Sequence, residues 1–337
     1  MLQFKTDNMN TTENDTDLRE RLANPDATVR RIALLDLSDW AGDEHADLFI
    51  LALRDTDATV RAEAARALEG FECPEGVAGL ALLLGDAEPG VRQAAAQSLS
   101  EVKQPDNAQV LLPHLAHADP FVKTAILRAV RELRSPHSYA PALAALADGN
   151  AAVRREAVAV LGYLKQADAL PALTALISGD PDAEVRRAAV GAAGYGASTA
   201  TAAALLNALR DPVWQVREEA ATTLGKLTGL RDGADAASLL EVGTALMAAL
   251  DDTYWQIRLR AARSLGRLQY AAAVPALLPV LTHAISNLRK EAALALGELG
   301  DATALPALEP VAADPDPEVR KAARLALEQI HAATRRH

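Results

Sequence analysis

A Val-Arg pair, or a close equivalent, recurs along this chain at an almost constant interval of about 31 residues, within the range of periods that indicates a repeat architecture. A single globular core imposes no such period, whereas an array of stacked repeats does. The apolar residue of the pair occurs at Val29, Val60, Val91, Val122, Val153, Val185, Val216, Ile257, Leu288 and Val319. The interval is one position longer after Val153 and much longer after Val216, which marks an insertion between the seventh and eighth copies. The sequence therefore predicts ten stacked repeats.

Each copy predicts a first helix (helix A), a tight turn and a second helix (helix B). In the sixth copy Pro171 opens helix A, residues 179–182 form the turn, and helix B begins near Val185. Apolar residues follow the repeated valine at offsets of 4, 8 and 11, which is one stripe of a helix. Aromatic residues make up only 4% of the chain, and abundant alanine and leucine favour helices over strands. We expect an all-α fold, an α-solenoid of about ten helical pairs that forms a right-handed superhelix with helix B on its inner, concave face.

The turns carry a second periodic feature, an aspartate six residues before the arginine of the pair. Seven of the ten copies keep both residues. Six residues across a turn can place the carboxylate beside the guanidinium of its own repeat or of the adjacent one, and can also cap helix B. Because these charges recur along the array, we interpret them as architecture and not as catalytic groups. The aspartates are Asp55, Asp86, Asp148, Asp180, Asp211, Asp252 and Asp314.

The spacing of Asp, Val and Arg and the paired helices resemble HEAT repeats, in the short form found in phycobilin lyase subunits and deoxyhypusine hydroxylase. The resemblance covers about residues 17–335 and implies a binding scaffold, since scaffolds dominate this family. Similarity to the lyase subunits implies chaperone-like handling of a linear tetrapyrrole. Similarity to the hydroxylase implies a di-iron centre held by His-Glu dipeptides, but this chain has no such dipeptide. We therefore predict no catalytic residue, no metal site, no cofactor and no enzymatic activity.

Composition excludes several other classes of function. A net charge of −11 opposes general binding to nucleic acid. No uncharged apolar run is long enough to span a membrane. The single cysteine, Cys73, permits no internal disulfide, and the chain does not open like a signal peptide. We expect a cytoplasmic protein.

The domain organisation follows from the repeats. Residues 1–16 are polar and lack helical periodicity, which is typical of a disordered leader. We assign residues 17–228 to repeats 1–7 and residues 229–337 to an insertion loop followed by repeats 8–10 of the same solenoid. Gly229 and Gly233 bracket the loop, which is interpreted either as a hinge or as a partner contact.

Function is best sought where the array departs from its own pattern. Trp214 and Trp255 occupy matching turn positions that other repeats fill with small or polar residues. Each indole can cover a neighbouring helix end or contact a partner, and the sequence leaves both interpretations open.

The second departure is a row of helix B positions, ten residues after the repeated valine, that changes from aromatic to basic. The row contains Tyr163, Tyr195, Lys226 and Arg267, and Arg260, Arg263 and Arg267 share one helical face. In an acidic protein this basic cluster indicates an anionic feature on a ligand, such as an acidic peptide. The alternative is a solvated helix face that is paired with nearby acids.

The sequence thus favours a non-catalytic scaffold or adaptor that binds a protein or peptide with an acidic feature on the concave face. The alternative is an accessory or chaperone subunit for a cofactor-bearing enzyme of the tetrapyrrole lyase type. The predicted partner-binding residues are Tyr163, Tyr195, Trp214, Lys226, Trp255, Arg260, Arg263 and Arg267.

Overall fold

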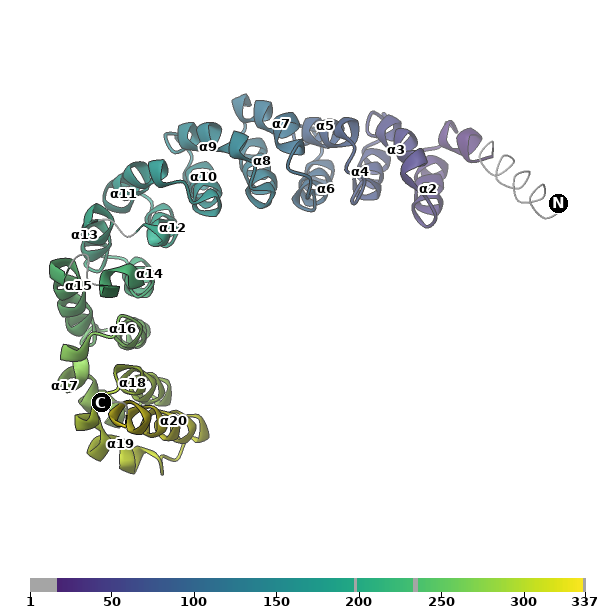
Figure 1. Ribbon diagram of the computed structural model, residues 1–337. Coiled ribbons are helices and arrows are strands. Elements are labelled where there is room, and N and C mark those ends of the chain that lie inside the picture. The colour runs from purple at the N-terminus through teal and green to yellow at the C-terminus, as the bar shows by residue number, and fades with distance from the viewer. Residues whose placement is uncertain (1–16, 197–198, 233–235, 336–337) are drawn as a thin grey trace. The chain divides into compact units, whose positions relative to one another are not determined.

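A computed structural model describes residues 17–196, 199–232 and 236–335 as helices joined by short turns (Figure 1). No strand occurs in these ranges. The chain divides into two compact units, residues 1–164 and 165–337. The predicted leader, residues 1–16, and Gly233 of the insertion lie outside the described residues. The predicted all-α solenoid is confirmed, and the handedness of a superhelix stays a prediction.

The first unit alternates helix A and helix B elements, and residues 17–22 form its first described helical segment. Its B helices are α2 (Ala27–Ser38), α4 (Ala58–Ala67), α6 (Pro89–Ser100), α8 (Pro120–Leu133) and α10 (Ala151–Leu164). Its A helices are α3 (Ala46–Ala52), α5 (Pro74–Leu83), α7 (Asn107–Leu111) and α9 (Tyr139–Ala145). Short 3-10 turns are η1 (Asp43–His45), η2 (Leu112–Ala116) and η3 (Pro136–Ser138). Successive B helices contact each other, so the repeats stack as the period predicts.

The second unit continues the pattern, with the A helices in one layer and the B helices in the other (Figure 1). Its A helices are α11 (Leu170–Gly179), α13 (Thr199–Ala208), α15 (Ala236–Ala249), α17 (Val274–Leu277) and α19 (Leu305–Val311). Its B helices are α12 (Ala183–Ala192), α14 (Trp214–Leu224), α16 (Trp255–Arg267), α18 (Ser286–Leu299) and α20 (Pro317–Thr334). Its 3-10 turns are η4 (Ala167–Ala169), η5 (Ala193–Tyr195), η6 (Thr228–Asp232), η7 (Ala271–Ala273), η8 (Leu278–Thr282) and η9 (Ala302–Ala304).

The core lies between the layers and between neighbouring B helices, where small residues allow close approach. Within α10 the predicted stripe of Val153, Ala157 and Leu161 is fully buried. A Cβ on Gly266 would lie 2.8 Å from the Cα of Ala295 on the next B helix. The absence of a side chain at Gly266 therefore allows α16 and α18 to approach closely.

The repeated aspartates and arginines form a ladder that joins adjacent repeats. Arg61 donates from Nε and Nη2 to the two carboxylate oxygens of Asp86, at 2.7 and 2.9 Å. Its Nη1 donates to the backbone carbonyl oxygen of Asp55, in its own turn, at 2.8 Å. Equivalent ion pairs are Arg30–Asp55, Lys123–Asp148, Arg186–Asp211, Arg217–Asp252 and Arg289–Asp314. The arginines thus hold their own turns closed and pair with the carboxylate of the next repeat.

The prediction that the ladder aspartates cap helix B is wrong. Asp57, two residues after Asp55, is the N-cap of α4 and accepts from the backbone N–H of Thr59. Asp55 instead accepts from the backbone N–H of Asp57 at 2.8 Å, which fixes the turn before the helix. The carboxylate that faces the neighbouring repeat lies too early in the turn to reach the first helical N–H groups.

Histidine replaces the ladder aspartate in two repeats, at His117 and His283. In both, Nδ1 accepts from the backbone N–H two residues later, at 3.0 Å, as the aspartate does elsewhere. Nε2 of His283 lies 3.3 Å from Nη1 of Arg258, in the position of the missing carboxylate. An imidazole therefore keeps the turn but supplies no negative charge to the arginine.

Candidate functional site

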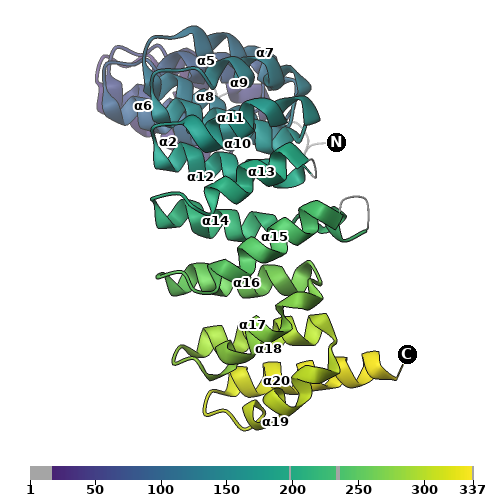
Figure 2. The same cartoon turned by 90° about the vertical axis from the view of Figure 1, so that its left-hand side faces the viewer.

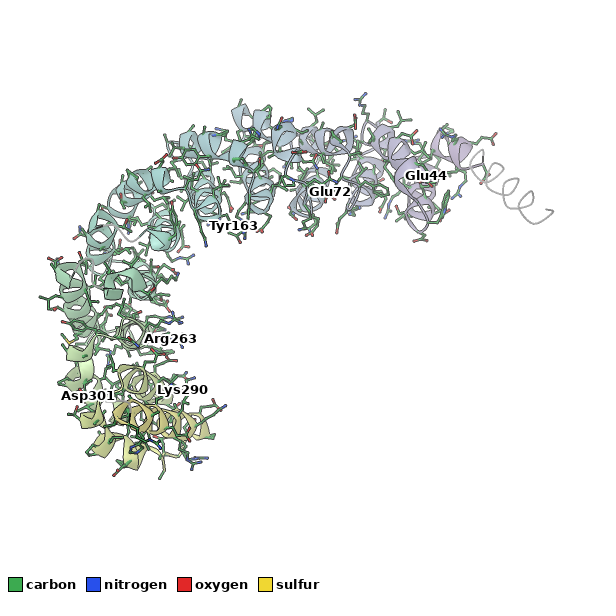
Figure 3. All side chains as sticks on the ribbon, viewed as in Figure 1. Glu44, Glu72, Tyr163, Arg263, Lys290 and Asp301 are labelled. Atoms are coloured by element: carbon green, nitrogen blue, oxygen red, sulfur yellow. The ribbon has the colours of Figure 1, made fainter. Side chains whose placement is uncertain are left out.

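A surface groove of about 240 Å³ opens on the helix B layer of the second unit. It is lined by α14, α16 and α18. Its residues are Glu218, Trp255, Gln256, Leu259, Arg260, Arg263, Asn287, Lys290 and Glu291. Figure 3 shows the labelled Arg263 and Lys290 on neighbouring B helices of this unit. We call this surface the B-layer groove, and it contains three of the predicted partner-binding residues.

The repeat places these side chains together. Trp255, Leu259 and Arg263 are spaced by four residues on α16 and so form one stripe of that helix. Asn287 and Lys290 are three residues apart on α18, one repeat further along. The groove therefore combines the apolar side chains of Trp255 and Leu259 with basic and acidic groups from the same and the neighbouring helices.

Two of the three predicted arginines in this region are paired with acids. Arg263 donates from Nε to Glu291 at 2.9 Å and makes a second bond to the same carboxylate from Nη2. Glu291 is only 3% exposed, and its hydrogen bond raises the pKa of Arg263 against the opposing effect of burial. Arg260 donates from Nε to Glu218 at 3.1 Å. Both arginines therefore fit the alternative of a helix face that is paired with nearby acids.

Lys290 differs from the arginines because it has no ion-pair partner in the described part of the chain. Its ammonium lines the same groove as Arg260, whose terminal Nη groups are not used in its bond to Glu218. A guanidinium has five N–H donors and an ammonium has three. Both cations therefore retain donors for an anionic group of a ligand.

The glutamates that pair with these arginines were not expected from the sequence. Glu291 and its equivalents occupy the third position after the repeated apolar residue and join neighbouring B helices, whereas Glu218 lies two positions after Val216. Arg31 pairs with Glu63 at 3.1 Å and Arg128 pairs with Glu156 at 2.9 Å, as Arg263 pairs with Glu291. The recurrence of glutamate at this offset was visible in the sequence as a second structural signal.

The two tryptophans have different surroundings. Trp214 stacks on Tyr254, with ring centroids 5.2 Å apart and planes inclined by 10°. The guanidinium of Arg217 lies 5.6 Å from the centroid of the same Tyr254 ring. Trp214 therefore covers the neighbouring turn, whereas Trp255 is 36% exposed and lines the B-layer groove. Tyr254 was missed because its partner comes from another repeat.

The two predicted tyrosines lie in different units. Tyr163, labelled in Figure 3, is exposed near the end of α10, with the guanidinium groups of Arg131 and Arg134 5.4 and 5.5 Å from its ring centroid. Tyr195 is half-buried and donates its hydroxyl to the backbone carbonyl of Gln166 at 2.7 Å. That hydrogen bond gives Tyr195 a role in joining two repeats.

Lys226 and Arg267, the last predicted residues, are exposed near the ends of α14 and α16 and do not line the groove. Nζ of Lys226 lies 3.9 Å from Glu219. Burial raises the pKa of Glu298, and the charge of Arg267 opposes that shift. Both cations are therefore near carboxylates of the B layer.

Neither a metal site nor a membrane span occurs in the described part of the chain. Among the residues that the structure describes, no group of three or more His, Cys, Asp or Glu side chains could hold a metal ion. No helix in the same ranges is long and apolar enough to cross a membrane.

Comparison with protein families gives one match. A family model described as HEAT repeats matches residues 46–131, 139–195, 177–242 and 243–328. No curated protein matches the chain. The more specific resemblance to phycobilin lyase subunits stays a prediction.

Solved structures share the fold at low sequence identity. An engineered protein has a TM-score of 0.54 and 21% identity, with 94% of this chain and 98% of that chain covered. Kap121p bound to Pho4p has a TM-score of 0.69 and 14% identity, with 96% of this chain and 43% of that chain covered. Kap95p, in a complex with RanGDP, has a TM-score of 0.63 and 15% identity, with 94% of this chain and 50% of that chain covered. These similarities concern the solenoid fold.

Proposed function

We propose that this chain, which belongs to the HEAT-repeat family, is a protein-binding scaffold whose B-layer groove holds an acidic segment of a partner. The observation that carries the proposal is the groove between α16 and α18, where Lys290 and Arg260 present unused donors beside the indole of Trp255. Regular stacking of the repeats requires none of these side chains.

The size of the groove favours a peptide over a small molecule. Its volume of about 240 Å³ is below the range of roughly 300 to 1,000 Å³ that is usual for small-molecule sites. One or two side chains of a longer segment fit such a space. Trp255 and Leu259 suit an apolar side chain, and Lys290 suits a neighbouring carboxylate. Aromatic and arginine side chains are also the residue types that most often dominate binding energy at interfaces.

The fold itself supports a protein partner. Kap121p, which resembles this chain in fold, has been crystallised bound to Pho4p. In repeat solenoids, extended faces built from successive repeats serve as binding surfaces. A partner of this chain would contact the same helix layer through neighbouring repeats.

The test is a selection of displayed random dodecapeptides on the full chain, followed by titration of the enriched peptides. We expect enriched peptides to carry Asp or Glu next to an aliphatic or aromatic residue. Trp255→Ala and Lys290→Glu should each weaken binding about tenfold or more, which is roughly 1.4 kcal/mol or more.

Matched controls come from the same chain. Lys321→Glu reverses an exposed lysine at the equivalent position of the next B helix, and Trp40→Ala removes an exposed indole of the first unit. Both should leave affinity within about twofold of the wild type. Enrichment of basic peptides, or equal losses in the control variants, would rule out the B-layer groove as the binding site.

A further inference from the structure

A second groove lies on the opposite, helix A layer of the second unit, where the insertion interrupts the array. It has a volume of about 720 Å³ and lies between α13 and α15. Figure 2 shows these two helices side by side, and they contact each other. At 14 residues α15 is the longest helix A of the described residues. We call this surface the A-layer groove.

The packing of α15 explains why the groove stays open. Gly243 faces the ring of Tyr270, and a Cβ at this glycine would lie 2.6 Å from ring atoms. Tyr270 is almost fully buried, and Val242 and Leu246 of α15 are fully buried. This side of α15 is therefore pressed against the repeat that follows. The opposite side turns toward α13 and lines the groove.

The open side of α15 carries an exposed stripe of uncharged, largely apolar side chains. Leu240, Thr244 and Ala248 are spaced by four residues and all are exposed, with Leu240 at 59%. Leu206 and Leu209, on and just after α13, line the facing wall and are half-buried. Two helices thus offer an apolar trough, and the length of α15 corresponds to about 21 Å of helix, or nearly four turns.

The charged rim of the trough is mainly acidic. Glu241 and Asp251 are exposed, and neither has an ion-pair partner among the described residues. Asp252 is already paired with Arg217 of the ladder. Arg210 is the single cation among the described residues that line the groove. An occupant that complements this rim carries positive charge beside an apolar face.

We infer that the A-layer groove binds an amphipathic, basic helix of a partner protein. Apolar residues of that helix at positions i, i+3 or i+4, and i+7 would lie along Leu240 and Ala248. Lysine or arginine residues beside the apolar face would meet Glu241 and Asp251. This surface is separate from the B-layer groove and would allow one scaffold to hold two partners with opposite charge.

The test uses two synthetic helical peptides that match α15 in length and share one leucine face, one with lysine and the other with glutamate at the remaining positions. Binding to the full chain is measured by fluorescence anisotropy. We expect the lysine peptide to bind at least about tenfold more tightly than the glutamate peptide. Leu240→Asp should weaken the lysine peptide about tenfold, and Ala248→Trp should do the same by filling the trough without a change of charge.

The matched control is Leu82→Asp, which changes a leucine that is 66% exposed on α5, outside the described cavities. It should leave the affinity unchanged, as should Lys290→Glu in the B-layer groove. Melting curves of the same variants check that each is folded. If the lysine peptide is held only by non-specific attraction to the acidic chain, Leu240→Asp should strengthen its binding, because the change adds a negative charge. That result would overturn the inference. A wild-type dimer that Leu240→Asp dissolves would also overturn it, because a second copy would then occupy the groove.

Discussion

Replacement of His283 by aspartate is expected to stabilise the protein, because it supplies the missing carboxylate of the ladder opposite Arg258. Nη1 of Arg258 lies 3.3 Å from Nε2 of His283. A guanidinium can only donate, and Nδ1 of His283 already accepts from the backbone N–H of Ile285, so Nε2 of the neutral ring carries the hydrogen and offers Arg258 no acceptor. At the next junction Arg289 donates to both oxygens of Asp314, at 2.7 and 2.8 Å.

The size of the effect follows from that comparison. The aspartate would keep the turn, because Asp314 accepts the equivalent backbone N–H, that of Asp316, at 2.8 Å. It would add a charge-assisted bidentate pair in a half-buried position. Hydrogen bonds to charged groups contribute about 1.5 to 3 kcal/mol, and exposed ion pairs about 0 to 1. Partial burial places the gain at about 1 to 2 kcal/mol, or roughly 2 to 8 °C in Tm for a unit of this size.

The assay is thermal unfolding at pH 7, with urea unfolding as a second measurement. His137→Asp is the control, since His137 is exposed and lies off the ladder. Arg258→Met should abolish the gain from His283→Asp in a double-mutant cycle. Equal stability of His283→Asp and wild type, or a gain that persists without Arg258, would refute the ladder as the source of the stabilisation.

Three further changes test other parts of the stack. Asp86→Asn should lower the free energy of unfolding by about 1 to 2 kcal/mol. The hydrogen bond from Arg61 holds the pKa of Asp86 below its ordinary value against the opposing effect of burial. The stabilisation by the carboxylate is therefore present above about pH 3.9 and is lost as pH falls through its folded-state pKa, a change that urea unfolding at several pH values measures. Gly266→Ala should destabilise by about 1 to 2 kcal/mol in chemical unfolding, since its Cβ would lie 2.8 Å from the Cα of Ala295 and the cost of overpacking exceeds the gain in helix propensity. Tyr195→Phe should cost about 0.5 to 1.5 kcal/mol in thermal unfolding, because its hydroxyl donates to a backbone carbonyl of the preceding repeat.

Control substitutions and a change of pH distinguish these specific effects from a general loss of stability. A Cβ on Gly90 meets nothing within 4 Å, so Gly90→Ala should be neutral or stabilising by up to about 1 kcal/mol. Equal losses at Gly90 and Gly266 would contradict the packing explanation. An Asp86→Asn effect that does not change between pH 7 and pH 3 would contradict the electrostatic one. Weaker peptide binding by Tyr195→Phe without a loss of stability would return Tyr195 to the binding surface.

The array was predictable because the same residue pattern occurs ten times in the sequence, once in each repeat. One apolar stripe on a helix is ambiguous, but Val153, Ala157 and Leu161 have equivalents in the other copies, and random matches do not recur at one period. The periodic Asp and Arg residues likewise identified the ladder before its geometry was known. Repetition also separated architecture from the positions where a function is expected.

Contacts between repeats were not predictable to the same extent. Pairing of Arg263 with Glu291 joins residues 28 positions apart, and the stacking of Trp214 on Tyr254 crosses the insertion. Such contacts depend on how one helix is rotated against the next, which a residue pattern does not determine. The prediction from sequence therefore treated Arg263 as free positive charge and did not identify Lys290 as a residue of the groove.

The candidate site was predicted in part. Trp255, Arg260 and Arg263 do line one groove, because residues on the same helix keep their relative positions however that helix is rotated against its neighbours. The groove itself arises between α16 and α18, and its depth depends on side chains from both helices. The A-layer groove had only an indirect sign in the sequence, the long interval between Val216 and Ile257.

The most direct test of the proposed scaffold is a charge swap between Lys290 and an acidic peptide obtained by the selection. Lys290→Glu and replacement of the acidic peptide residue by lysine should each weaken binding about tenfold or more, and the two changes together should restore most of the affinity, since the pair is then re-formed with reversed charges. Lys321→Glu should restore nothing with the same lysine-substituted peptide. Losses that simply add, with no recovery in the Lys290→Glu combination, would contradict binding of an acidic segment in the B-layer groove.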